Sequence, residues 1–231
     1  SKQGYEEFQI GFVQDWNRFL FNHDTECLTY PAAYISGQPL SFLPQNIVAH
    51  LEEISQSCVP LSSLVDIFVG VQTSADQIYI IHADEDENFI YSHDRQGREF
   101  QIEKGILRKS IYDTQLVSYE KIEANSYIIF PYKAVNGRPV LYSLAEMTED
   151  FPHALAYLNR FKDKLDERNM PGRTTENWFA FGRSQSLKRF LAGEHLVWPV
   201  LSTSSNYVYD NDMVVFTGGG NGPFYGIEKK V

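Results

Sequence analysis

The most informative polar side chains of this sequence lie in a short connection between two apolar runs. Residues 64–69 and 78–81 are rich in Val, Ile, Phe and Tyr, which favours buried strands. Gln72, Thr73 and Ser74 lie between them and offer amide and hydroxyl groups without formal charge. The pattern predicts a β-hairpin whose loop presents neutral hydrogen-bonding groups for recognition. The alternative is an ordinary surface turn, in which the same residue types are common.

A second polar stretch, residues 170–190, mixes aromatic residues with Arg, Gln and Lys. In the major groove of DNA, Arg pairs with guanine and Gln with adenine through two hydrogen bonds, while Lys neutralises phosphate. The composition indicates a surface that reads base pairs, and its candidate contacts are Arg173, Arg183, Gln185 and Lys188. The alternative is structural, with Trp178 and Phe181 packed beneath a surface helix that starts near Ser184.

Other candidate DNA contacts lie outside these two stretches. Arg108 and Lys109 form a basic pair within an apolar run, and each could instead be a surface cation whose aliphatic stem covers apolar neighbours. Residues 217–226 form a Gly-rich loop that contains Asn221, and glycine lets a backbone approach a ligand closely. Pro223 breaks the Gly-x-Gly-x-x-Gly register, so a nucleotide-binding loop is not predicted.

Asp212, Glu228 and Lys230 support a different hypothesis, a metal-dependent endonuclease domain. A carboxylate followed by Glu-x-Lys resembles the core of many restriction nucleases, in which carboxylates hold Mg²⁺ and Lys helps to activate water. A Gly-rich loop intervenes where a continuous strand would be expected, so this hypothesis ranks second.

No metal site is assigned elsewhere in the sequence. The four carboxylates at 84–87 fit a solvated loop, because adjacent residues of an extended chain point to opposite sides. His82, His93 and Asp94 lack the spacing of zinc ligands. We therefore expect neither a catalytic residue nor a bound metal in this chain.

Charge is distributed unevenly along the 231 residues. The formal net charge is −10, which taken as a whole argues against a polyanionic partner. Residues 1–100 hold 4 Lys and Arg against 15 Asp and Glu, whereas residues 151–193 hold 8 against 4. A positive surface on an acidic protein is therefore compatible with DNA binding. A protein-interaction module that uses the acidic half is a third hypothesis.

The elements that must position these groups suggest an α+β fold with mixed and antiparallel sheets and several helices, without regular βαβ alternation. Helical spacing of apolar residues predicts helices at 5–21 and 47–55, and a long helix from Asp150 onward. Ser143 and Glu146 have the spacing of a capping box. Residues 207–209 and 213–216 are expected to pair around a turn. Residues 1–60 are expected to be a helical lead-in or linker from another domain.

The cellular setting follows from what the sequence lacks. It has only two cysteines, Cys27 and Cys58, and no Asn-x-Ser/Thr site, which fits a reducing compartment. No apolar run approaches the roughly 20 residues that cross a bilayer. We expect a soluble, cytoplasmic protein with no membrane partner.

Several motifs, taken in their order along the chain, resemble a known family. They are residues 67–73, 129–132, 157–158 with 165–168, 178 with 181–185, and 216–223. Together they resemble the TaqI-like specificity, or target recognition, domain at the C-terminal side of Eco57I-type adenine-N6 DNA methyltransferases, which include restriction-modification fusions. The resemblance covers about residues 61–226.

The resemblance implies that residues 61–231 form a target recognition domain that binds double-stranded DNA beside its own methyltransferase domain. Such enzymes methylate adenine with S-adenosylmethionine after the base is flipped out of the duplex. The chain contains neither an Asn/Asp-Pro-Pro-Tyr/Phe motif nor a Gly-rich motif for S-adenosylmethionine, so both functions are expected in a separate catalytic domain. The family pattern usually continues past Val231, so we expect a domain truncated at its C-terminal end.

Overall fold

The computed structural model describes residues 6–13, 15–22, 26–32, 43, 45–85, 88–218 and 222–230. The chain divides into two compact units, Ser1–Pro60 and Leu61–Val231. Helices and mostly antiparallel sheets give the α+β fold that the sequence predicts. No helix within the described ranges is both long enough and apolar enough to cross a bilayer.

The first unit differs from the helical lead-in expected for it. Its elements are β1 (Glu7–Phe12), α1 (Trp16–Asn22), β2 (Glu26–Pro31) and α2 (Gln45–Ser57). The prediction of one helix over 5–21 is therefore wrong, whereas the second helix is confirmed as α2. β1 pairs antiparallel with β2, and Phe8 stacks on Tyr30 with ring centroids 5.6 Å apart. This cross-strand pairing outweighs the local helical spacing of the apolar residues.

The second unit holds every candidate DNA contact. Its strands are β3 (Val65–Val69), β4 (Ile80–Ile81), β5 (Asp84–Glu85), β6 (Phe89–His93), β7 (Glu99–Glu103), β8 (Leu107–Ile111), β9 (Ser126–Ile129), β10 (Tyr132–Val135), β11 (Arg138–Leu141), β12 (His195–Pro199), β13 (Val208–Asp210), β14 (Val215–Phe216) and β15 (Phe224–Lys229). Its helices are α3 (Asp76–Tyr79), α4 (Leu144–Asp150), α5 (Pro152–Asn159) and α6 (Lys162–Asp166), with 3-10 turns η2 (Leu61–Ser63), η3 (Lys104–Ile106) and η4 (Leu187–Phe190).

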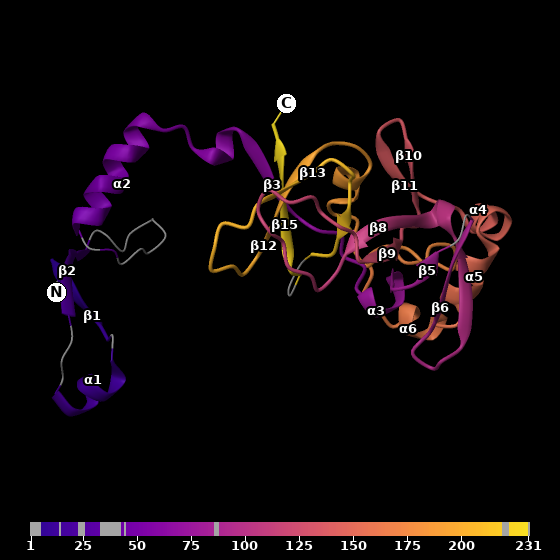
Figure 1. Ribbon diagram of the computed structural model, residues 1–231, viewed down its shortest axis with the longest axis horizontal. Coiled ribbons are helices and arrows are strands. Elements are labelled where there is room, and N and C mark those ends of the chain that lie inside the picture. The colour runs from indigo at the N-terminus through magenta and orange to yellow at the C-terminus, as the bar shows by residue number, and fades with distance from the viewer. Residues whose placement is uncertain are drawn as a thin grey trace, which may run out of the picture. The chain divides into compact units, whose positions relative to one another are not determined.

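Two four-stranded sheets organise this unit. One has the order β13-β12-β15-β3 and the other β14-β8-β9-β4. A three-stranded sheet, β5-β6-β7, and the hairpin β10-β11 complete it. Figure 1 shows the sheet of β3, β12, β13 and β15 at one side of the unit and helices α4, α5 and α6 at the other, with β8 and β9 between them.

The predicted hairpin between β3 and β4 does not form. β3 pairs with β15 and β4 pairs with β9, so the two strands belong to different sheets. The short helix α3 lies between them and carries the chain from one sheet to the other. Both apolar runs do become strands, but a local pattern of apolar residues does not specify the partner of a strand.

Three further sequence predictions have mixed outcomes. β13 pairs with β12, and β14 pairs parallel with β8, so the expected pairing of 207–209 with 213–216 is wrong. The capping box at Ser143 and Glu146 is confirmed at the start of α4. The long helix expected from Asp150 is divided into α5 and α6, and Pro152 occupies the first turn of α5.

Aromatic side chains join α3 and the hairpin β10-β11 to the segment 178–181. Tyr79 is fully buried, and its hydroxyl donates a hydrogen bond of 2.9 Å to the Phe179 carbonyl. The Tyr132 hydroxyl accepts a hydrogen bond of 2.8 Å from the Phe181 N–H. Trp178 and Phe181 are buried as the structural alternative predicted, and the surface turn that follows them is η4. The core thus fixes the backbone immediately before Arg183.

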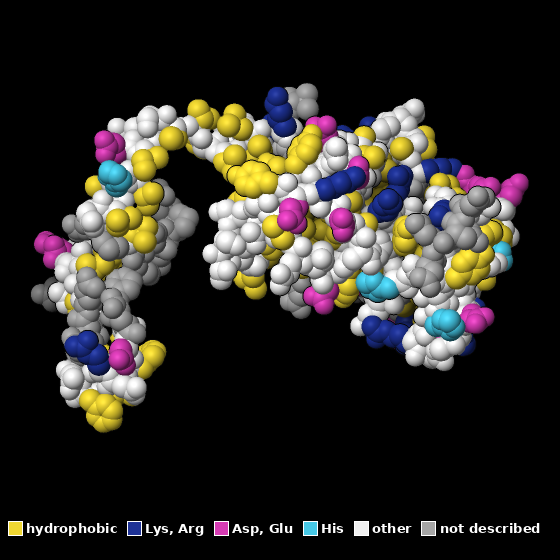
Figure 2. Space-filling view, viewed as in Figure 1, with side chains coloured by type: hydrophobic (Ala, Val, Ile, Leu, Met, Phe, Trp, Pro, Cys, Tyr) yellow, Lys and Arg dark blue, Asp and Glu magenta, His cyan; other side chains and the backbone are white. Residues whose placement is uncertain are grey.

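The outer face of the first four-stranded sheet carries a row of apolar residues. Ile67, Ile227, Leu196 and Tyr209 lie in register across its four strands. All but Ile227 are exposed. Figure 2 shows hydrophobic side chains reaching the surface in this region, whereas the Lys and Arg side chains stand apart from one another. The positive groups on this view therefore form no continuous band.

Candidate nucleic-acid interface

Three segments that are distant in the sequence meet at the C-terminal end of β3. Val71 forms a parallel bridge with Thr217, and Gln72 forms an antiparallel bridge with Arg183. The Gly218 N–H donates to the Val71 carbonyl at 2.9 Å, and the Arg183 N–H donates to the Gln72 carbonyl at 3.2 Å. Residues 72–74, 182–183 and 217–218 are therefore directly hydrogen-bonded neighbours, so parts of all three polar stretches lie at one place in the fold.

Glycine is required where these segments touch. A Cβ atom at Gly70 would overlap the Phe216 carbonyl oxygen, and one at Gly218 would overlap the backbone of Gly70. A Cβ atom at Gly182 would likewise overlap the Ser74 side chain. Gly218 of the Gly-rich stretch therefore allows close backbone packing beside β3.

The recognition loop, defined as residues 72–74, is held by a turn of its own. The Thr73 hydroxyl donates to Asp76 Oδ1 and accepts a hydrogen bond of 2.9 Å from the Ala75 N–H. Thr73 is fully buried, so its side chain shapes the turn and does not reach a ligand in this conformation. Ser74 adopts φ of 57°, a left-handed conformation that non-glycine residues rarely occupy, and its side chain is exposed. Of the three residues of this loop, Gln72 and Ser74 therefore remain as candidate DNA contacts.

Arg168 fastens this loop to the aromatic core. Its Nη1 donates to the Thr73 carbonyl at 2.7 Å and its Nη2 to the Trp178 carbonyl at 2.8 Å. The guanidinium carbon also lies 5.6 Å from the centre of the Tyr79 ring. The sequence analysis does not single out Arg168 as a functional residue. The available signal was its place in the family-like motif at 165–168, which did not reveal its partners.

The side chains best placed for base reading follow directly on this junction. Arg183 and Gln185 are exposed, and the Arg183 backbone is fixed by Gln72. Among the described residues, the Arg183 guanidinium has no ion pair. Lys188 is exposed on η4, a few residues further along the chain. These four properties are those that the sequence hypothesis requires of Arg183, Gln185 and Lys188.

The remaining candidate contacts are placed differently. Arg173 pairs with Asp166 at 2.8 Å, so its charge is already compensated. Arg108 and Lys109 are exposed on β8, where the guanidinium carbon of Arg108 lies 6.0 Å from the centre of the Phe130 ring. Lys109 lines a separate cavity with Lys121 and Asp212, away from the residues around Gln72. Asn221 lies outside the described residues.

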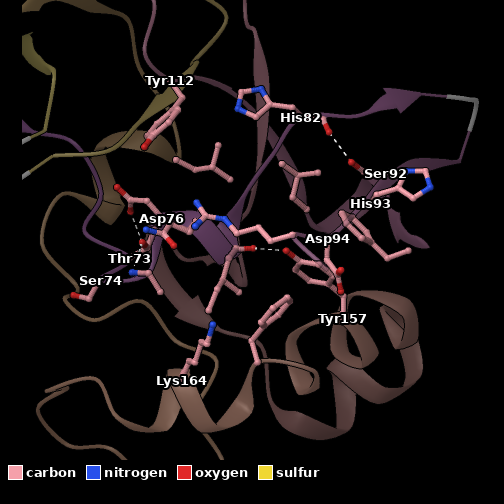
Figure 3. A pocket seen from close by; sticks show the side chains of 18 of the residues that line it. Thr73, Ser74, Asp76, His82, Ser92, His93, Asp94, Tyr112, Tyr157 and Lys164 are labelled. Carbon is pink, nitrogen blue, oxygen red and sulfur yellow. Dashed lines mark hydrogen bonds between the residues drawn. The ribbon is translucent and has the colours of Figure 1, made fainter. Parts of the chain in front are cut away.

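A cavity of about 870 Å³ opens beside the recognition loop, and we call it the loop cavity. Its walls include residues 72–77, the end of β6 with Asp94 and Arg95, α6 with Lys164, and Gly218. Figure 3 shows Thr73, Ser74 and Asp76 on one side of it, His93 and Asp94 on the opposite side, and Lys164 below. Ile78, Phe100 and Tyr157 contribute apolar surface to its floor.

The carboxylate of Asp94 in this cavity is held ionised by its neighbours. Burial acts to raise the pKa of Asp94, but the Arg98 and Gln96 N–H groups and the Arg98 guanidinium together lower it to about 2. Arg98 Nε lies 2.7 Å from Asp94 Oδ2, and Arg160 Nη1 lies 3.5 Å from the same oxygen. Asp94 therefore serves the fold, since its hydrogen-bonding capacity is used by the turn between β6 and β7.

The residues of the endonuclease hypothesis are not brought together as a metal site. Asp212 pairs with Lys121 at 2.8 Å, and Glu228 pairs with Arg189. Lys230 lies 3.6 Å from Asp66 instead. Within the described ranges, no three His, Cys, Asp or Glu side chains cluster in a way that could hold a metal ion. The structure therefore does not support Asp212, Glu228 and Lys230 as a joint metal site.

Comparison with known proteins gives two relatives. No protein-family model matches the chain. Over 234 residues it is 26% identical to the Type II restriction enzyme and methyltransferase RM.Eco57I of Escherichia coli. This alignment covers 95% of this chain and 23% of that protein. Over 215 residues it is 22% identical to the Type II methyltransferase M.BanIII of Aneurinibacillus aneurinilyticus. This second alignment covers 89% of this chain and 34% of that protein. The homologues of this chain are thus Type II restriction and modification methyltransferases, and it matches a part of such an enzyme.

Proposed function

We propose that residues 61–231 form a target recognition domain, which gives an adenine-N6 DNA methyltransferase or restriction-modification enzyme its DNA sequence specificity. The observation that carries this proposal is the junction of residues 72–74, 182–183 and 217–218 by backbone hydrogen bonds. Sequence reading requires several polar groups aimed at one groove, and a rigid backbone keeps them in register. The relatives supply the enzyme class.

Neutral and cationic side chains have separate tasks in this proposal. Gln72, Ser74 and Gln185 offer donors and acceptors for base edges, and Arg183 offers the paired donors that match guanine. Lys188 neutralises a phosphate, which adds affinity without sequence information. The recognition loop suits base reading because its side chains carry no formal charge that would need an oppositely charged partner within the protein.

The chemical step is assigned to a separate catalytic domain. That domain would bind S-adenosylmethionine and receive the flipped adenine, because the sequence of this chain lacks the motifs for both. The residues of this chain then position the duplex so that one adenine lies at the catalytic pocket. Double-stranded DNA and the methyltransferase domain are therefore its two proposed partners.

The test is a comparison of methylation rates on duplexes that differ by one base pair within the site. In the full-length enzyme, Gln72→Ala combined with Arg183→Ala and Gln185→Ala should bring the rate on the correct site close to the rate on altered sites. Arg138→Ala, which removes an exposed cation on β11 outside the three segments of the junction, serves as the control and should keep the discrimination.

Thermal unfolding of both variants shows whether they remain folded. If the folded triple variant discriminates among duplexes as the wild type does, these residues do not read bases. Deleting residues 61–231 tests the domain as a whole, since site-specific methylation that survives the deletion would refute the proposal.

A further inference from the structure

The loop cavity adds a group of cations to the recognition loop that the sequence did not single out. Arg95 follows β6, and Lys164 lies on α6, so the two come from separate elements. Both are exposed side chains that line the cavity. Neither makes an ion pair with any residue in the described part of the chain. Their positive charges are therefore available to a ligand.

The carboxylates of the cavity are largely engaged by the protein itself. Asp94 pairs with Arg98 and Arg160, and Asp76 accepts the hydroxyl hydrogen bond of Thr73. Arg98 and Arg160 do not line the cavity, but they compensate the charge of Asp94. Among the described residues, the lining is thus left with two unpaired cations, Arg95 and Lys164, against one carboxylate, Asp76. The cavity therefore carries positive charge on a protein whose formal net charge is −10, and such a local field attracts anions.

We propose that the loop cavity binds backbone phosphates of the DNA strand that passes the recognition loop, through Arg95 and Lys164. This inference rests on the proposed function. One wall of the cavity is the recognition loop itself, so a strand whose bases meet Gln72 and Ser74 brings its phosphates close to the other residues that line the cavity, which include Arg95 and Lys164. The volume of about 870 Å³ lies in the range of roughly 300–1,000 Å³ typical of ligand clefts.

The apolar floor supports a sugar-phosphate ligand over a bare anion. Ile78 and Phe100 line the cavity, and the Tyr157 hydroxyl is already donated to the Ile78 carbonyl at 3.0 Å. A deoxyribose can pack on this floor while its phosphates reach the cations at the rim. Phosphate contacts of this kind fix the register of a protein on a duplex and carry no sequence information.

The experiment is a fluorescence titration of the full-length enzyme with labelled duplexes at several salt concentrations. Arg95→Ala combined with Lys164→Ala should lower affinity for specific and unrelated duplexes by the same factor, roughly tenfold. The slope of log affinity against log salt should fall by about 2, since each phosphate contact contributes about 0.9. Arg138→Ala combined with Lys229→Ala removes two exposed cations that do not line the cavity and should leave the slope unchanged.

Three outcomes would overturn the inference. The double variant could keep the wild-type salt slope, or it could change the preference among sequences instead of the overall affinity. AMP could also bind saturably at constant ionic strength, with binding lost in the double variant while DNA affinity stays the same. The ligand would then be a free nucleotide.

The proposed function is judged separately by the variants at Gln72, Arg183 and Gln185. If those variants lose discrimination while Arg95→Ala with Lys164→Ala has no effect, the recognition function stands and the phosphate site is wrong. If the residues 72, 183 and 185 have no influence on discrimination, the recognition function itself fails.

Discussion

The polar residues at the two ends of β3 differ in whether other residues of the protein already pair with them. At its N-terminal end, Asp66 lies in register with Glu228 of β15, and Arg189 contacts both carboxylates. Beyond its C-terminal end, Gln72 and Ser74 are neutral, and the neighbouring Arg183 side chain is exposed. The first group is a closed ion-pair network, whereas the second has hydrogen-bonding groups left over for a ligand.

The difference shows which polar clusters of a sequence can be expected to act on a ligand. Carboxylates and cations at catalytic-looking spacing can be paired with other residues of the fold, as Glu228 is with Arg189 and Lys230 with Asp66. A recognition surface needs unused donors and acceptors on a fixed backbone, because a group already paired must first give up its partner. The predictions below test whether the two ends of β3 are separate in this sense.

The largest effect is expected from Gly70→Ala, which should disrupt the junction at the open end. The new Cβ would overlap the Phe216 carbonyl oxygen, so the free energy of unfolding should fall by roughly 3 kcal/mol. Urea denaturation measures this change. Gly137→Ala is the control: Gly137 has φ of +70° and open space around it, so backbone strain alone should lower stability by about 1–2 kcal/mol. Equal losses in the two variants would contradict the close contact.

Arg183→Ala should affect recognition without affecting the fold. If the guanidinium contacts guanine, discrimination at one base pair should decrease by about 1–3 kcal/mol. The stability should stay within about 0.5 kcal/mol of wild type, because the side chain is exposed. Binding titrations against duplexes altered at each position measure the first effect. A uniform loss of affinity over all duplexes would instead assign Arg183 to a phosphate.

Arg189→Met should have the opposite result at the closed end. It leaves Asp66 and Glu228 facing each other without their shared cation, and the free energy of unfolding should fall by about 1–2 kcal/mol. Base discrimination should be unchanged. The adjacent Lys188→Met is the matched control, with stability near wild type and a salt slope of DNA binding reduced by about 1. A loss of discrimination in Arg189→Met would show that the two ends are coupled.

The smallest effect concerns His195, which lies beside the closed end. Burial lowers the pKa of His195, although Glu228 opposes this shift, and neither ring nitrogen has a hydrogen-bond partner among the described residues. Below the usual pKa near 6.5 the unfolded chain takes up a proton that the folded chain resists. Stability should therefore fall as pH drops from 6.5 to the lowered folded-state value, by up to about 1 kcal/mol.

His195→Phe should remove this pH dependence, because phenylalanine fits beside the rings of Phe68 and Phe190. Urea denaturation at about pH 8 and about pH 5.5 compares the two proteins. The exposed His153 on α5 provides the control, since His153→Gln should keep the wild-type difference between the two pH values. A wild type with equal stability at both values would show that His195 titrates normally.

Much of the fold could be predicted from the sequence, because local signals are strong for single elements. The strands at 65–69 and 126–129, the helix at 45–57 and the capping box at Ser143 each follow from residues close together. Strand partners could not be predicted. β3 chooses β15, which lies about two-thirds of the chain away, and that choice depends on packing between sheets.

The sequence predicts the polar residues of the candidate site, but it does not predict the neighbouring cations that hold or line it. The sequence indicates which loops carry neutral hydrogen-bonding groups. Arg168, Arg95 and Lys164 gave no separate signal, because a cation on a helix or turn looks the same whether it contacts a carbonyl, a carboxylate or solvent. Only the tertiary structure distinguishes these cases.

The glycine contacts at the junction have a consequence for exchanging specificity between related enzymes. Gly70 touches Gly218, and Gly182 touches Ser74, so the segments at 70–74, 182–185 and 217–218 fit one another only as a set. A chimera that receives one of these segments from a relative combines backbones that were not selected together. Transfer of all three, together with Arg168, is the smallest graft that keeps every hydrogen bond of the junction.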